Sequence, residues 1–171
     1  MAIKKKDFKD IKKKFSSSAK FKPQRFYDLG KDFLDAVGVP GPAMGHLNMF
    51  LGHSDTGKTT ALVKVAVDAQ KKGILPVFII TEQKWSFDHA KLMGFDCEEV
   101  VDEETGELDW DGFFLFNNNF EYIEQITDFI NELLDAQEKG DLEYDLLFLW
   151  DSVGSVPCKM TYDGKGGKQH N

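Results

Sequence analysis

The segment Gly52–Thr60, GHSDTGKTT, constrains the fold more than any other part of this sequence. An apolar run, LNMFL, precedes it, and an amphipathic stretch, ALVKVAVDAQKK, follows it, which predicts the order strand, loop, helix. Gly52 lets the chain turn sharply out of the strand, and Gly57 lets backbone N–H groups approach an anion closely. The start of the following helix adds further N–H groups and the positive end of its dipole. The segment therefore predicts a phosphate-binding loop.

The pattern Gly-x-x-x-x-Gly-Lys-Thr also assigns chemistry to single positions in this loop. The ammonium of Lys58 is expected to reach the β- and γ-phosphates of a nucleotide, and the Thr59 hydroxyl is expected to bind Mg²⁺. The predicted ligands are thus a nucleoside triphosphate and Mg²⁺. The predicted nucleotide-binding residues of the loop are Gly52, His53, Ser54, Asp55, Thr56, Gly57, Lys58, Thr59 and Thr60.

The rest of the chain alternates apolar strands with helices. Buried strands that read as continuous apolar runs and alternate with helices are typical of a parallel sheet covered on both faces. We therefore predict an α/β fold with a mostly parallel sheet, and an acidic hairpin within it over 100–112. The expected strands are 46–52, 74–81, 113–117 and 145–151, and the expected helices are 26–37, 58–72, 86–93 and 120–137.

Two carboxylates stand where predicted strands end. Asp151 closes LLFLWD, and Glu82 directly follows PVFIIT. Sites in open parallel sheets gather at the carboxyl ends of the strands. Asp151 is expected to help Thr59 hold Mg²⁺, and Glu82 is expected to orient and deprotonate an attacking water. Taken alone, each carboxylate is also compatible with an ordinary solvated position at a strand end.

The charge of the chain is unevenly distributed. The net charge is −8, yet residues 1–25 hold ten Lys and Arg against two Asp, a balance of +8 that leaves −16 for the rest. Phe8, Ile11 and Phe15 recur among these lysines at helical spacing. We predict a basic helical arm over 1–36 and a nucleotide-binding core over 37–171. The arm is either a contact for nucleic acid or an acidic neighbouring subunit, or a solvated tail.

Other classes of protein find little support in the sequence. No apolar run approaches the roughly 18 residues that a membrane-spanning helix needs, and the amino-terminal lysines are not followed by a secretory apolar stretch. Cys97 and Cys158 fit no metal-ligand spacing and are expected to be reduced structural thiols. We predict a cytoplasmic protein without a membrane partner.

Three segments together resemble the RecA recombinase family. They are GHLNMFLGHSDTGKTTALVKVAVDAQKKG with the family's Walker A loop, PVFIITEQKWSFDHAKLMGFD with its catalytic glutamate, here Glu82, and DLLFLWDSVGSV with its Walker B strand. The three segments occur in the family's order over roughly residues 36 to 160. In the way they diverge from other members of the family, they most resemble bacteriophage recombinases related to UvsX. The resemblance implies a RecA-like P-loop core with Lys58 and Glu82 as catalytic residues. If a phage encodes the protein, the resemblance also implies that the protein is located in the host cytoplasm.

The resemblance further implies an ATP-binding, DNA-dependent ATPase of recombination and repair. Such a protein forms filaments on single-stranded DNA and promotes strand exchange, and its amino-terminal arm docks on the next subunit. Ser86 and His89 are expected near the nucleotide base, although the family often places other residues there. Lys165 and Lys168 lie in a glycine-rich stretch that resembles the start of the family's first DNA-binding loop.

The resemblance covers only the first part of such an enzyme. In the family, a strand that comes after the Walker B strand inserts beside the strand of the phosphate loop, whereas this sequence ends at Asn171. The expectation is the amino-terminal part of a recombinase, which is either a truncated or interrupted gene product or half of a split protein that a separate carboxy-terminal fragment completes. The alternatives are a RecA-like helicase or accessory ATPase, and a nucleotide-binding assembly module that does not hydrolyse ATP.

Overall fold

The computed structural model describes residues 13–14, 23–82, 84–103 and 106–164 of the chain. The basic helix expected around Phe8, Ile11 and Phe15 and the expected DNA contacts Lys165 and Lys168 lie outside the described residues. No helix in the described part is long and apolar enough to cross a membrane.

A three-stranded parallel sheet forms the centre of the core. Its order is β4 (Leu115–Asn117), β1 (Leu75–Ile80), β5 (Leu146–Asp151), so the central strand is β1 and both of its neighbours run parallel to it. Every residue of β1 is buried, as expected for a strand covered on two faces. Pro76 precedes the first residue of β1 that pairs with β4, Val77, so its missing N–H leaves no gap in that ladder.

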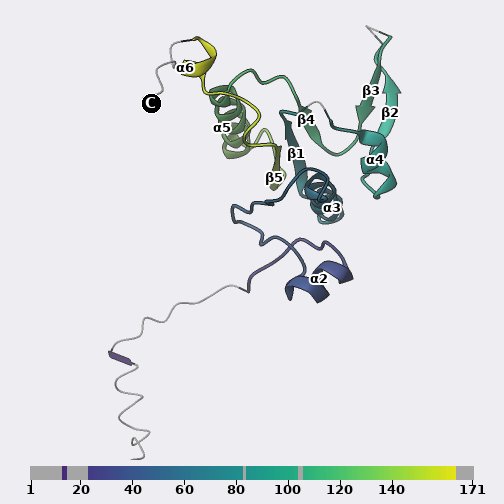
Figure 1. Cartoon of the computed structure of the whole chain (residues 1–171), viewed down its shortest axis with the longest axis vertical. Coiled ribbons are helices and arrows are strands. Elements are labelled where there is room, and N and C mark those ends of the chain that lie inside the picture. Colours follow the sequence, from purple (N-terminus) through teal and green to yellow (C-terminus); the bar gives the residue numbers. More distant parts are fainter. Residues whose placement is uncertain (1–12, 15–22, 83, 104–105, 165–171) are drawn as a thin grey trace, which may run out of the picture.

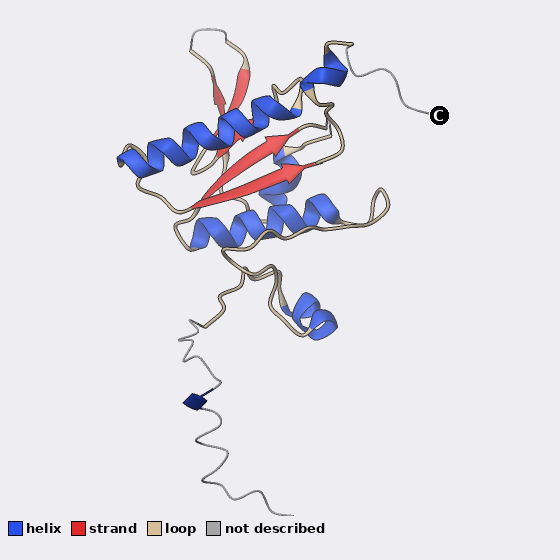
Figure 2. Ribbon diagram, turned by 90° about the vertical axis from the view of Figure 1, so that its left-hand side faces the viewer, coloured by secondary structure: helices blue, strands red, loops and turns tan. Residues whose placement is uncertain are grey.

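Helices cover both faces of this sheet, as the sequence predicts. Figure 2 shows helix α3 (Lys58–Lys71) on one face and helix α5 (Ile123–Lys139) on the other. The inner face of α3 consists of small and β-branched side chains that pack on the sheet, and α5 buries Ile126 against the opposite face. Gly73, with φ of 68°, adopts the left-handed conformation just beyond α3 and so ends that helix.

The acidic segment forms the predicted hairpin. Strands β2 (Glu98–Val101) and β3 (Leu108–Asp111) pair antiparallel and project beyond the sheet, with helix α4 (Phe87–Leu92) at their base (Figure 1). The rings of Phe87 and Trp110 stack at a centroid distance of 5.3 Å and join the hairpin to α4. This contact connects the hairpin to an aromatic cluster around Phe78 in the sheet.

The strand predicted over 46–52 is wrong, because these residues join no sheet. Three apolar side chains of the segment lie largely in solvent: Leu47 is 96% exposed, Met49 62% and Leu51 84%. A strand is stable only when neighbours satisfy its backbone N–H and C=O groups. None of the strands in the described part of the chain pairs with this segment.

The residues before the core form an extended stretch followed by a short helix, rather than the single helix predicted over 26–37. The predicted helix over 26–37 shortens to α2 (Lys31–Val37), because Tyr27 and Leu29, two positions apart, are both buried against the core. The N–H of Tyr27 donates to Pro42 O at 2.9 Å, and the N–H of Leu29 donates to Pro40 O at 2.9 Å. Part of the segment expected as an arm therefore packs on the core.

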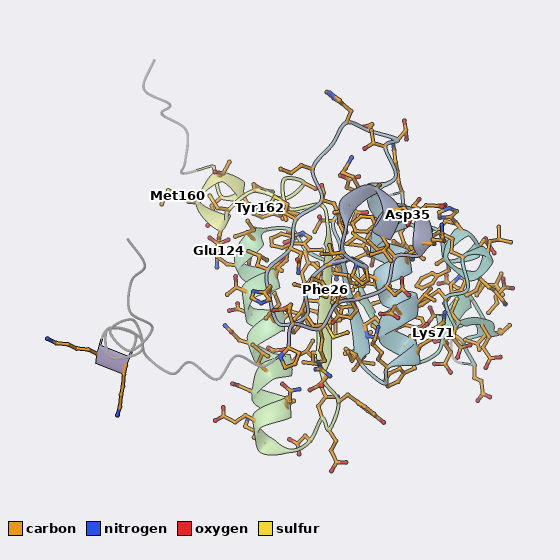
Figure 3. The ribbon with its side chains drawn as sticks, turned by 90° about the horizontal axis from the view of Figure 1, so that it is seen from below. Phe26, Asp35, Lys71, Glu124, Met160 and Tyr162 are labelled. Atoms are coloured by element: carbon orange, nitrogen blue, oxygen red, sulfur yellow. The ribbon has the colours of Figure 1, made fainter. Side chains whose placement is uncertain are left out.

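A short helix, α6 (Lys159–Tyr162), lies at the other end of the described chain. Figure 3 shows Met160 and Tyr162 of α6 next to Glu124 at the start of α5. The Glu124 carboxylate accepts a hydrogen bond of 2.8 Å from the Lys159 N–H, which satisfies one free donor of this short helix. The segment that follows β5 is thereby fastened to α5.

Candidate nucleotide-binding site

The phosphate-loop residues Gly52–Thr60 connect the irregular segment 46–51 to α3. Gly57 stands immediately before α3 with φ of 87°, a conformation that a residue with a side chain rarely adopts. Asp55 also has a positive φ, of 63°. At Gly52 a Cβ atom would come within 2.7 Å of Thr56 Oγ1, so the close approach of these two residues requires glycine. The loop thus has the tight curvature that the sequence predicts.

The side chain of Lys58 lies across its own loop. Its Nζ donates a hydrogen bond of 2.6 Å to His53 O, and Thr56 Oγ1 donates to the same carbonyl at 2.8 Å. Two donors from the loop therefore converge on one carbonyl oxygen. The bond to His53 O holds the Lys58 ammonium within the loop. An anion bound by the loop would therefore contact this ammonium as well as the free N–H groups at the start of α3.

Thr59 and Asp151, the two predicted Mg²⁺ ligands, lie in direct contact. Thr59 Oγ1 donates a hydrogen bond of 2.6 Å to Asp151 Oδ2, although 92 positions separate them in the sequence. No group of three or more His, Cys, Asp or Glu side chains in the described part of the chain could hold a metal alone. The contact between a hydroxyl and a carboxylate brings together two oxygen ligands of the kind that Mg²⁺ takes in proteins, where phosphate oxygens and water complete its shell.

Glu82 meets the residues that follow β5. Ser152 Oγ donates to Glu82 Oε1 at 2.5 Å, and Ser155 Oγ lies 2.6 Å from Ser152 Oγ and 3.5 Å from Glu82 Oε1. Thr81 Oγ1, one residue before Glu82, donates to Ser152 O at 2.8 Å. The carboxyl ends of β1 and β5 are therefore joined by side-chain hydrogen bonds, and Glu82 and Asp151 stand at the ends of two adjacent strands.

Sequence reasoning missed the roles of Ser152 and Ser155 as partners of Glu82. The signal was present in the stretch SVGS directly after Asp151, where small polar residues follow a strand that opens into a site. Which hydroxyl would face which carboxylate depends on the register of β1 against β5, where Ile80 is opposite Asp151. That register is a tertiary property, which the sequence pattern alone does not specify.

Ser86 and His89 belong to α4. Ser86 is the N-cap of α4, since its Oγ accepts a hydrogen bond from the His89 N–H at 3.2 Å. Both residues are exposed, and among the described residues no hydrogen bond joins either of them to the phosphate loop. A contact of Ser86 or His89 with a nucleotide base stays a prediction.

The fold and the site together define the class of this protein. A glycine-rich loop leads into a helix that covers a parallel sheet, and a carboxylate from the end of a sheet strand is hydrogen-bonded to the loop's threonine. This is the arrangement of P-loop α/β nucleotide-binding domains.

Comparison with known proteins specifies the class further. No protein-family model matches the chain. The chain is 28% identical to the protein RecA of Wolinella succinogenes over 142 residues, which are 83% of this chain and 34% of that protein. It is 33% identical to the protein RecA of Syntrophobacter fumaroxidans over 135 residues, 79% of this chain and 33% of that protein.

These similarities relate the chain to the RecA family, and the α/β core is RecA-like. The chain spans about a third of the length of the curated relatives that it matches.

Proposed function

We propose that this chain binds ATP with Mg²⁺ and belongs to a DNA-dependent ATPase of recombination and repair. The observation that carries the proposal is the hydrogen bond between Thr59 and Asp151, which places the phosphate loop beside the carboxylate that a nucleotide-bound cation needs. The relationship to RecA proteins over about four fifths of the chain supports the same conclusion.

Each loop residue has a defined task in this proposal. The backbone N–H groups around Gly57 and the first turn of α3 bind phosphate oxygens, and Lys58 exchanges His53 O for an oxygen of the terminal phosphates. Mg²⁺, when bound, neutralises phosphate charge beside Thr59 and Asp151. Glu82 holds the attacking water with the carboxylate oxygen that Ser152 does not occupy.

Binding and turnover are separated by two substitutions. Lys58→Ala is expected to weaken Mg·ATP binding by about a hundredfold or more, since it removes the charge that meets the phosphates. Glu82→Ala is expected to retain binding and to abolish any turnover. Isothermal calorimetry and a phosphate-release assay measure these effects, with Lys71→Ala, at the far end of α3, as the control. Unchanged ATP affinity in Lys58→Ala would contradict the proposal.

The proposed partners follow from the family relationship and the charge distribution. They are single-stranded DNA, further copies of this chain in a filament, and a separate polypeptide that supplies the remainder of the core. The basic segment 1–25, with its balance of +8, is proposed to contact the acidic body of a neighbouring subunit. Deletion of residues 1–20 is expected to abolish filaments seen by electron microscopy while ATP binding persists. Filaments of the truncated chain would exclude this role.

A nucleotide-binding assembly module is the second candidate. Its support is the hydrogen bond that Glu82 makes to Ser152, because a carboxylate so occupied has fewer acceptor sites free for water. The two candidates differ in one measurement. If the chain is such a module, Glu82→Ala should bind Mg·ATP with wild-type affinity. Neither the wild type nor Glu82→Ala should then release phosphate, with or without DNA.

A further inference from the structure

The Ser155 hydroxyl lies beside the contact between Ser152 and Glu82. Its Oγ is 2.6 Å from Ser152 Oγ, 3.1 Å from Ser152 O and 3.5 Å from Glu82 Oε1. Three acceptors therefore surround a hydroxyl that has a single proton to donate. The acceptor that receives this proton decides what Ser155 does for the site.

The direction of these hydrogen bonds follows from the number of protons. Each serine hydroxyl donates one proton and accepts through two lone pairs. Ser152 Oγ donates its proton to Glu82 Oε1 at 2.5 Å. Two hydroxyl oxygens 2.6 Å apart need a proton between them, and Ser152 has none left, so Ser155 Oγ is the donor. The three groups form a chain of hydrogen bonds that runs from Ser155 through Ser152 to one oxygen of Glu82.

The backbone holds both serines in place for this chain of hydrogen bonds. The Ser155 N–H donates to Ser152 O at 3.2 Å and closes a four-residue turn, which returns the Ser155 side chain to Ser152. Thr81 Oγ1 donates to the same carbonyl at 2.8 Å, and the Thr81 N–H donates to Asp151 O at 2.8 Å. The turn is thus fastened to Thr81, the residue directly before Glu82.

A chain of hydroxyls affects how the carboxylate at its end is held. Hydrogen bonds in series polarise one another, so the proton from Ser155 strengthens the bond that Ser152 makes to Glu82. Both hydroxyls approach Oε1, and no hydrogen bond among the described residues engages Oε2. The carboxylate is therefore held with one oxygen occupied and the other available to a water molecule.

We propose that Ser155 is a positioning residue for ATP hydrolysis, which acts through Ser152 to hold Glu82 with Oε2 directed at the attacking water. This inference rests on the proposed function, because it requires that Glu82 orients such a water. Within the described part of the chain, Ser155 makes no hydrogen bond to the phosphate loop. Its loss therefore impairs the attack of water and leaves nucleotide binding unchanged, whereas a serine that only closes a turn has no such selective effect.

Two ligands of the full chain separate these effects in calorimetry. Mg·ADP reports on the phosphate loop, whereas Mg·ADP with aluminium fluoride imitates the transition state, including the water in line with the phosphate. Ser155→Ala is expected to weaken the aluminium fluoride complex about tenfold and to change the affinity for Mg·ADP less than about twofold. In a phosphate-release assay with single-stranded DNA, it should lower kcat about tenfold at unchanged KM.

Two single substitutions serve as controls for this experiment. Ser155→Thr keeps the hydroxyl and should bind both ligands as the wild type does. Thr127→Val removes a hydroxyl that bonds only within its own helix, to Ile123 O, and should also behave as the wild type. If Ser155→Ala weakened both ligands equally, or neither, the proposal would be overturned. A wild type that binds Mg·ADP and gains nothing from aluminium fluoride would overturn the roles of Glu82 and Ser155 together.

Double variants test whether the effect passes through Ser152 to Glu82. In the Ser152→Ala background or in the Glu82→Ala background, Ser155→Ala should weaken the aluminium fluoride complex no further, because the chain of hydrogen bonds is already interrupted. Additive losses would show that Ser155 acts independently of both partners, and they would contradict its role as a positioning residue.

Urea denaturation without nucleotide tests the chain of hydrogen bonds by itself. Ser155→Ala is expected to lower the folding equilibrium constant about threefold in the wild type and less than about 1.5-fold in the Ser152→Ala background. Equal losses in the two backgrounds would refute the chain. A coupled loss in a wild type that binds neither ligand would overturn the proposed function and the role of Ser155 in hydrolysis, while the chain of hydrogen bonds would stand.

Discussion

Thr59 and Asp151 are joined by a hydrogen bond of 2.6 Å that connects the phosphate loop to the end of β5. Thr59→Val removes the hydroxyl without changing the volume of the side chain, and it is expected to lower the free energy of unfolding by about 1 kcal/mol. It should also weaken Mg·ATP binding at least about tenfold. Chemical denaturation and calorimetry measure the two effects. Thr59→Ser keeps the hydroxyl and should resemble the wild type, so equal losses in both variants would contradict this role.

Gly57 is expected to be intolerant of a side chain for conformational reasons alone. Its φ is 87°, and a Cβ atom placed there would meet nothing within 4 Å. Gly57→Ala should therefore cost about 1–2 kcal/mol of unfolding free energy through backbone strain, and it should weaken phosphate binding. Gly154→Ala is the matched control, since that glycine also has open space and lies outside the left-handed range. A loss at Gly154 as large as that at Gly57 would refute the explanation.

Much of this architecture was predictable, because the signals that carry it are local. The phosphate loop, helix α3 and strand β1 each depend on residue types within one short segment, and their observed bounds fall within a residue or two of the predicted ones. The prediction of a strand over 46–52 was wrong for the opposite reason. The apolar run of this segment predicts a strand, but whether a strand forms depends on a neighbour that no local pattern encodes. Likewise, the contact of Ser152 with Glu82 depends on strand register.

Phe78 is expected to be the most sensitive position of the core. It is fully buried in β1, and its ring contacts Trp85, Phe95 and Phe114 at centroid distances of 4.6, 5.4 and 6.4 Å. Phe78→Ala should lower the free energy of unfolding by about 3–5 kcal/mol, since it removes buried area and leaves a cavity. Urea denaturation measures this loss. Leu108→Ala, at a residue that is 68% exposed, should stay within about 0.5 kcal/mol of the wild type.

The raised pKa of Tyr27 predicts a loss of folding stability at alkaline pH. Burial raises the pKa of its hydroxyl above the usual 10.0, and the nearby carboxylates of Asp68 and Asp145 raise it further. Because the folded pKa exceeds the unfolded one, the stabilisation is fully present below about pH 10 and is lost as pH rises through the folded value. Thermal melting at pH 9 and pH 11 should therefore show a smaller decrease in Tm for Tyr27→Phe than for the wild type. Equal decreases would exclude this contribution.

The two cysteines are expected to differ strongly in reactivity. Both are free, as predicted, but only Cys97 is buried, so the expectation of a structural thiol is met at that position and not at the exposed Cys158. Burial raises the pKa of the Cys97 thiol, whereas the hydrogen bond with the Thr161 side chain, 3.2 Å from Sγ to Oγ1, lowers the pKa of Cys158. A lower pKa gives more of the nucleophilic thiolate at neutral pH.

A thiol reagent such as dithionitrobenzoate at pH 7.5 should therefore modify Cys158 at least about tenfold faster than Cys97. Thr161→Val removes the hydroxyl that favours the thiolate, and it should shift the rate profile of Cys158 to higher pH. Thr161→Ser keeps a hydroxyl at the same place and should retain the wild-type profile. If Thr161→Val also retained it, exposure alone would account for the reactivity of Cys158, because the hydrogen bond would then have no measurable effect on the thiolate.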